Sequence, residues 1–238
     1  MYTKWMALFS CLWGTIPLGT LATDGHGMRG DPTVFHSFRL ETDIGVGREG
    51  ANIRWEFDGW IGGDTQKLWF KSEGEVLDGE THQGEFWAMY SRNITDFWDA
   101  QLGIREDIKP HSTPYAIVGF EGMAPYFFDT EAHLFISDEG DVSVRIRAEK
   151  DFLMTQALIL KPHIEINMFM QDVTDQNVGA GVAASEFGLQ TRYEFTRTCA
   201  PYLDVRYERT WGETASIARR EHESTDDFIT SLGLRLMF

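Results

Sequence analysis

Hydrophobic and polar residues alternate at every second position through most of this chain. The final segment shows the pattern clearly: Phe228, Leu232, Leu234, Leu236 and Phe238 share one parity, while Ser231, Gly233 and Arg235 share the other. A period of two predicts a β-strand with one apolar face. About twelve such segments of roughly ten residues follow one another, each bounded by turn residues. The expected strands cover residues 35–46, 52–61, 67–77, 84–91, 98–107, 115–124, 128–136, 142–153, 158–171, 185–195, 201–209 and 228–238.

The connections between these segments alternate in length. Residues 173–184 and 212–227 form the longest connections, whereas 62–66 and 93–97 are short. Short periplasmic turns, long outer loops and an even number of antiparallel strands are typical of bacterial outer-membrane barrels. The pattern predicts an all-β fold, an antiparallel transmembrane β-barrel of about twelve strands in the outer membrane, whose partner is the lipid bilayer. The alternative is a soluble β-sandwich in which the last segment is an edge strand.

The polar face of the expected strands carries charges of both signs, for example Arg145, Arg147 and Glu149 on one segment. In a closed barrel these side chains point into the lumen, where we expect them to form ion pairs that fill much of the interior. A wide passive pore is therefore not favoured. Aromatic residues near the strand ends predict a girdle at the membrane interface, formed by Trp87, Trp98, Tyr126, Phe127 and Phe128.

The first residues resemble a secretory signal, with Lys4 ahead of a mostly apolar stretch and a small residue, Ala22, at its end. We expect a signal peptide over residues 1–22, a short periplasmic segment over 23–35 and the barrel over 36–238. The formal net charge of -16 argues against a nucleic-acid partner, because nucleic-acid binding needs a basic surface. The same charge favours attraction of cations.

The motifs of the common enzyme classes are missing from the sequence. It contains no G-x-S-x-G nucleophile elbow, no H-E-x-x-H zinc motif and no Walker or dinucleotide fingerprint. We therefore do not expect an enzyme. A lipid-modifying barrel enzyme is the least favoured alternative, and a serine and a histidine converging on the lipid-facing surface would support it.

Several longer stretches resemble one bacterial family, the copper resistance protein B family. They are KLWFKSEGE (67–75), WDAQLGIR (98–105), GFEGMAPYFF (119–128), SDEGDVSVRIRAEKD (137–151) and LMTQALILKPHIEIN (153–167). The resemblance extends from about residue 36 to the end of the chain. It implies an outer-membrane barrel that binds copper ions and sequesters them or exports them from the periplasm, with a periplasmic multicopper oxidase as a partner.

The family commonly carries a segment rich in Met and His ahead of the barrel, and this chain largely lacks it. Between the expected signal and the first strand, the candidate metal ligands are Asp24, His26, Met28 and His36. This departure shifts attention to the barrel itself. His26 and Met28, in a D-G-H-G-M stretch, form a candidate copper site whose alternative is a simple linker.

Inside the barrel, His133 and His163 share the lumen-facing parity, with Glu131 and Glu165 beside them. Met123 and Met89 join them if their side chains point inward. Copper(I) prefers thioether sulfur and copper(II) accepts imidazole and carboxylate, so this set could form a copper relay of either valence. The alternative is that both histidines are hydrogen-bonded to glutamates in a packed polar interior. A porin-like or structural barrel without a metal role stays open as a second function.

Overall fold

The computed structural model describes residues 34–48, 50–77, 79–109, 112–221 and 224–238 of the chain. Nearly all of them belong to long antiparallel strands, as the alternation of side chains predicts. The strands are β1 (Phe35–Gly47), β2 (Gly50–Gly62), β3 (Gln66–Leu77), β4 (Glu80–Thr95), β5 (Trp98–Lys109), β6 (Thr113–Ala124), β7 (Phe128–Ser137), β8 (Val142–Glu149), β9 (Phe152–Leu153), β10 (Leu158–Phe169), β11 (Gly181–Tyr193), β12 (Cys199–Thr210) and β13 (Asp226–Met237).

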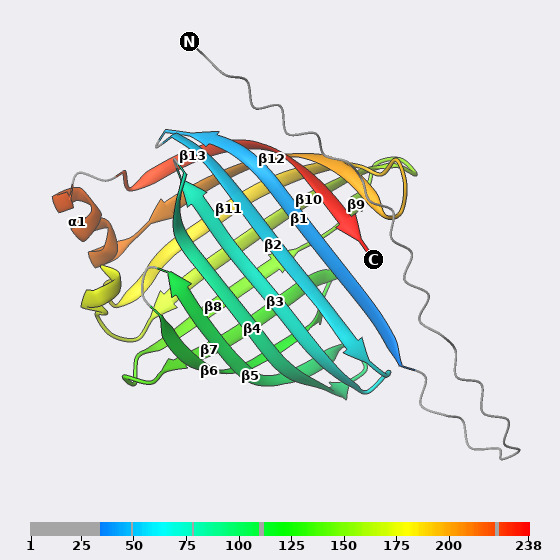
Figure 1. The fold of residues 1–238 in the computed structure, drawn as a ribbon, viewed down its shortest axis with the longest axis horizontal. Coiled ribbons are helices and arrows are strands. Elements are labelled where there is room, and N and C mark those ends of the chain that lie inside the picture. The colour runs from blue at the N-terminus through cyan, green and yellow to red at the C-terminus, as the bar shows by residue number, and fades with distance from the viewer. Residues whose placement is uncertain (1–33, 49, 78, 110–111, 222–223) are drawn as a thin grey trace, which may run out of the picture. The chain divides into compact units, whose positions relative to one another are not determined.

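The sheet closes on itself, because the first long strand pairs with the last (Figure 1). The pairing of β1 with β13 runs from Arg39 opposite Met237 to Val46 opposite Thr230. The short β9 and the longer β8 both pair with β10, and Lys150 and Asp151 lie between them. These two segments therefore occupy one position in the wall, and the predicted twelve-strand antiparallel barrel is confirmed.

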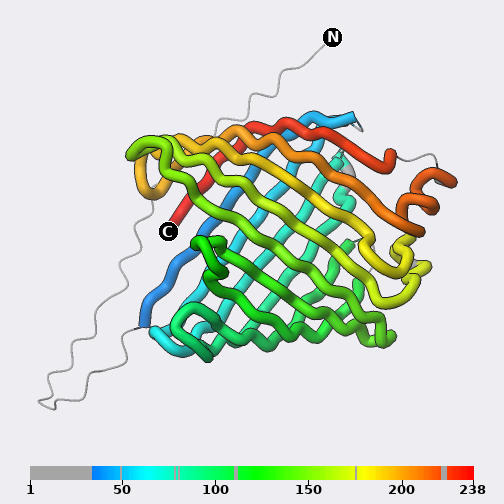
Figure 2. Tube along the Cα trace, turned by 180° about the vertical axis from the view of Figure 1, so that it is seen from behind, coloured from blue at the N-terminus to red at the C-terminus, as the bar shows by residue number. Residues whose placement is uncertain are grey.

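The two ends of the barrel differ as the lengths of the connections predict. The long connections at one end carry the short helix η1 (Thr174–Gln176) and the helix α1 (Gly212–Glu221), while the C-terminus lies at the other end with the short turns (Figure 2). By the rule for bacterial barrels, the end with the short turns faces the periplasm. In the part of the chain that the structure describes, neither helix is long and apolar enough to cross a membrane.

The α1 helix was expected only as a loop, and it is fastened to the outer end of the barrel. The backbone N–H of Gly179, in the β10–β11 connection, donates to Thr214 Oγ1 at 3.1 Å. Just before the helix, Trp211 Nε1 donates to Ser185 Oγ at 2.8 Å. The two longest outer connections are thus tied to each other and to the barrel wall.

Side chains of the predicted outer parity form the exposed apolar surface that a bilayer requires, for example Leu102 and Ile104 at 62% and 66% exposed. Tyr126 and Phe127 are exposed in the β6–β7 turn at the periplasmic rim, as an interfacial girdle requires. The prediction was wrong for Trp87. This residue has the inward parity of β4 and is completely buried inside the barrel.

Candidate functional site

A group of ion pairs crosses the lumen from β3 and β4 to β7 and β8. Lys71 Nζ lies 2.6 Å from Glu131 Oε2, and Arg145 binds the carboxylate of Glu85 through both terminal nitrogens, at 2.7 and 3.3 Å. Arg147 binds the Glu73 carboxylate in the same two-pronged way. In the sheet order β3-β4-β5-β6-β7-β8, the ends of this bridge lie five strands apart in a ring of twelve. We call these six residues the clasp: Lys71, Glu73, Glu85, Glu131, Arg145 and Arg147.

The clasp divides the lumen into two halves, and one half is packed like the core of a soluble protein. This packed half lies against β4 to β7. Trp87 and Phe135 meet edge to face with ring centroids 5.0 Å apart, and Met89, Tyr115 and Ile117 complete a buried cluster. The Arg105 guanidinium lies 4.8 Å from the centre of the Phe135 ring. Aromatic rings and a stacked cation fill the space here.

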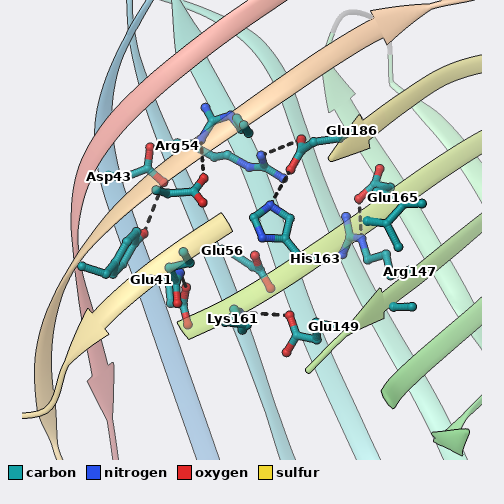
Figure 3. Close-up of a pocket in the computed structure, with 16 residues that line it drawn as sticks. Glu41, Asp43, Arg54, Glu56, Arg147, Glu149, Lys161, His163, Glu165 and Glu186 are labelled. Carbon is teal, nitrogen blue, oxygen red and sulfur yellow. Dashed lines mark hydrogen bonds and ion pairs between the residues drawn. The ribbon is translucent and has the colours of Figure 1, made fainter. Parts of the chain in front are cut away.

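The other half, lined by β8, β10 to β13, β1 and β2, is polar and contains a cavity of about 80 Å³ (Figure 3). We call this half the polar half and the cavity the inner cavity. In the inner cavity, each oxygen of the Glu186 carboxylate has a partner. Oε1 lies 3.2 Å from His163 Nε2, and Oε2 lies 3.1 Å from Arg54 Nη1. Asp43 accepts a hydrogen bond from the Tyr202 hydroxyl at 3.2 Å and lies 3.6 Å from Arg206 Nη1.

A larger cavity of about 510 Å³ lies at the periplasmic end of the lumen, and we call it the vestibule. Eight carboxylates and four basic side chains line it. Two methionines, Met123 and Met237, line it as well, one on β6 and the other at the end of β13. The vestibule is therefore acidic and carries thioether sulfur.

His133 lies in the packed half. Its side chain is only 2% exposed, its Nε2 lies 2.7 Å from Gln101 Oε1, and its ring meets Trp87 edge to face at 5.2 Å. Glu131 is 3.9 Å from its Nδ1, but that carboxylate is already paired with Lys71. His133 is thus a hydrogen-bonded histidine in a packed interior, but its hydrogen-bond partner is Gln101 and not the glutamate that the structural alternative named.

His163 lies in the polar half and is oriented differently. Its Nε2 contacts Glu186, while its Nδ1 is buried without a hydrogen-bond partner among the described residues. The ring lies flat over Gly188, where a Cβ would come within 2.1 Å of Nε2. A carboxylate on one nitrogen and a lone pair on the other is the arrangement of a histidine that can bind a metal.

The structure does not bring the two histidines together. On β8, His133 is opposite Arg145 and His163 is opposite Glu149. Four residues along one strand correspond to roughly 13 Å, and two strand spacings add to this separation. The clasp residue Arg145 also stands between them.

The remaining candidates are scattered through the barrel. Met89 is sealed in the packed half at 2% exposed, and Glu165 is held by Arg147 at 2.5 Å. Met123 is 38% exposed in the vestibule. His36 lies on the outward parity of β1 at the rim, beside Phe38. His26 and Met28 lie outside the described residues, as does the expected signal peptide.

Two residues that matter for this geometry were not among the predicted candidates. Met237 shares the parity of Arg235 in the last strand, so the alternation already placed it inward. Glu186 is the partner of His163 on the neighbouring strand, and only the register reveals it, because Glu186 is opposite Glu165 and the imidazole reaches it diagonally. Within the described residues, no three His, Cys, Asp or Glu side chains converge as a metal site.

Comparison with known proteins gives the family. The model of the family described as copper resistance protein B precursor (CopB) matches residues 35–238. Copper resistance protein B of Escherichia coli is 38% identical over 188 residues, covering 79% of this chain and 64% of that protein. The homolog from Pseudomonas syringae pv. tomato is 38% identical over 191 residues, covering 80% and 65%. The matched part thus spans slightly less than two thirds of these relatives.

Solved structures support the fold alone. The NanC porin superposes with a TM-score of 0.58 at 11% identity, covering 83% of this chain and 98% of that one. The KdgM porin superposes with a TM-score of 0.53 at 9% identity, covering 84% and 99%. Both likenesses agree with a closed antiparallel barrel of the outer membrane. The family match and the curated relatives together confirm the resemblance seen in the sequence: the chain belongs to the copper resistance protein B family.

Proposed function

We propose that this outer-membrane barrel binds copper ions from the periplasm, with the vestibule as the entry site. The observation that supports this most is the composition of the vestibule, where eight carboxylates surround a cavity that also exposes the Met123 and Met237 side chains. The negative field concentrates cations at this end of the barrel. The thioethers then favour copper(I) over the hard cations that outnumber it.

His163 is the second donor in this proposal. Neutral imidazole binds both copper(I) and copper(II), and Glu186 holds the ring by Nε2, while the buried Nδ1 has no hydrogen-bond partner among the described residues. Of the sulfur and nitrogen donors predicted inside the barrel, Met123 lines the vestibule and His163 lines the inner cavity next to it. His133 and Met89 are sealed in the packed half and serve packing. Sequestration or export of the bound copper would account for copper resistance, the property named in both curated relatives.

Copper titration of the full mature chain, refolded in detergent, tests this proposal. Met123→Leu keeps the volume of the side chain and removes the sulfur. We expect this change to weaken copper(I) binding by about tenfold or more. Removing a residue that only hydrogen-bonds to a metal ligand already lowers metal affinity by about tenfold or more, and Met123 is itself a ligand in this proposal. Met89→Leu makes the same chemical change in the packed half and is the matched control, with unchanged affinity.

Two further variants separate the alternatives. If His26→Ala with Met28→Ala abolishes binding while Met123→Leu has no effect, the metal site lies in the N-terminal segment and the vestibule proposal is wrong. If wild-type protein binds neither copper(I) nor copper(II), a barrel without a metal role replaces it. Copper tolerance of cells expressing equal amounts of each variant connects the binding data to resistance.

A further inference from the structure

Four cavities follow one another along the lumen, from the periplasmic mouth to the outer mouth. Beyond the vestibule and the inner cavity lie a third cavity of about 220 Å³ and an outer cavity of about 400 Å³ beneath α1. Each shares lining residues with the next. The vestibule and inner cavity share Glu56 and Glu149, the inner and third cavities share Arg54 and Glu186, and the third and outer cavities share Glu75 and Glu208.

This sequence of cavities avoids the buried cluster of the packed half, although the vestibule is also lined by Asp99 of β5 and by Glu121 and Met123 of β6. Trp87, Ile117, His133 and Phe135 line none of the four cavities. The clasp separates this cluster from the inner cavity, so the side chains of the cluster have no part in the route. The polar half is therefore the part of the barrel through which a small ion could pass.

The inner cavity is the smallest of the four, at about 80 Å³. At its boundary with the third cavity, Arg54 of β2 reaches Glu186 of β11 at 3.1 Å. In the sheet order β11-β12-β13-β1-β2, these strands lie four steps apart, so the ion pair spans the polar half from wall to wall. His163 holds the other oxygen of the same carboxylate. The Arg54–Glu186 pair thus crosses the route at the boundary of its smallest cavity.

Carboxylates outnumber basic side chains in every one of the four cavities. The ratios are eight to four in the vestibule, seven to four in the inner cavity, six to four in the third and four to one in the outer cavity. Carboxylate-lined pores attract cations and exclude anions. The excess is present along the whole length, so the sign of the preferred ion does not change on the way.

We propose that the polar half is a cation path through the outer membrane, with the Arg54–Glu186 pair as its constriction. This activity goes beyond copper binding and applies to small cations in general. A cation passes when Arg54 swings away from Glu186, and the carboxylate left behind then faces the ion. The packed half contributes rigidity and no conduction.

Ion conductance of the full mature chain in planar lipid bilayers tests the path, with potassium chloride on both sides and no copper present. We expect wild-type protein to conduct weakly and with preference for potassium over chloride. Arg54→Ala removes the guanidinium side chain that crosses the route to Glu186, so conductance should rise several-fold and the cation preference should increase. Glu186→Gln keeps the size of the side chain but leaves the Arg54 charge unbalanced, so the cation preference should fall.

The control is Ile117→Ala, which removes a completely buried side chain of the packed half. It should leave conductance unchanged, with folding of all variants checked by heat-modifiable mobility. Three outcomes would each overturn the proposed path. They are chloride selectivity of the wild type, unchanged conductance of folded Arg54→Ala, and a rise in the conductance of Ile117→Ala equal to that of Arg54→Ala. Because copper is absent from this measurement, its failure would leave the vestibule proposal standing, and a failed copper titration would leave the path standing.

Discussion

The two halves of the lumen are built on the same strand pattern and differ in what the inward positions carry. On β4 to β7 many of these positions are aromatic or aliphatic, and Trp87, Ile117 and Phe135 are at most 1% exposed. On β1, β2 and β10 to β12 they are mostly charged, and cavities remain between the side chains. One half therefore derives its stability from close packing and the other from ion pairs that tolerate space. This contrast should appear in the free energies of unfolding of variants in the two halves.

Removing the largest side chain of the packed half should give the largest effect. Trp87→Ala deletes a completely buried indole that contacts Phe135 and His133. We expect it to lower the free energy of unfolding by about 3–5 kcal/mol, because a large cavity is left in a well-packed region. Denaturant unfolding of the barrel refolded into lipid vesicles measures the loss. Met89→Leu conserves volume and should cost less than about 1.5 kcal/mol. A loss for Trp87→Ala no larger than this control would mean that the half is not a packed core.

Two glycines allow the same substitution in both halves. A Cβ at Gly119 would lie 2.3 Å from His133 Cδ2, and one at Gly188 would lie 2.1 Å from His163 Nε2. In the packed half the ring cannot move aside, so Gly119→Ala should cost about 1–3 kcal/mol. In the polar half the ring can turn into the inner cavity, so Gly188→Ala should cost less than about 1 kcal/mol. Equal costs, measured side by side by denaturant unfolding, would contradict the division of the lumen.

A small effect is also expected for the loss of a single hydroxyl of the polar half. Tyr202→Phe removes the hydrogen bond to Asp43 Oδ2 and keeps the ring. Arg206 Nη1 already lies 3.6 Å from the other oxygen of Asp43 and can compensate. We expect a loss of about 1 kcal/mol, near the net value of an ordinary hydrogen bond. A loss as large as that of Trp87→Ala would show that the polar half is as tightly packed as the other.

Strand positions and the facing of most side chains followed from the sequence alone. For example, the segments predicted over 35–46 and 67–77 agree within one residue with β1 and β3. This succeeds because alternation is a local property, and one buried or lipid-facing side determines the whole strand. The interruption at Lys150 and Asp151 and the α1 helix were missed, although Glu213 and Arg219 at the two ends of that helix are a recognisable signal.

Contacts across the lumen could not be predicted from the sequence. Arg147 was expected to form cross-strand ion pairs, and it does bind Glu165 on the paired strand β10, but it also reaches Glu73 on the far wall. Strand tilt and barrel diameter decide which inward side chains meet, and neither is visible in a periodic pattern. The same limit explains why His133 and His163 appeared able to converge. Their parity is right, but their heights along the wall are not.

The seam between β1 and β13 has a consequence for how the barrel is made. Phe238 donates its backbone N–H to Phe38 O and accepts from Phe38 N, at 2.9 and 3.2 Å. The first and last strands of the barrel therefore satisfy each other's outer edges. Before this seam closes, the sheet has two unpaired edges, which are prone to pair with other chains. Assembly of this barrel therefore requires that the edges of β1 and β13 stay apart from other chains until the two strands pair with each other.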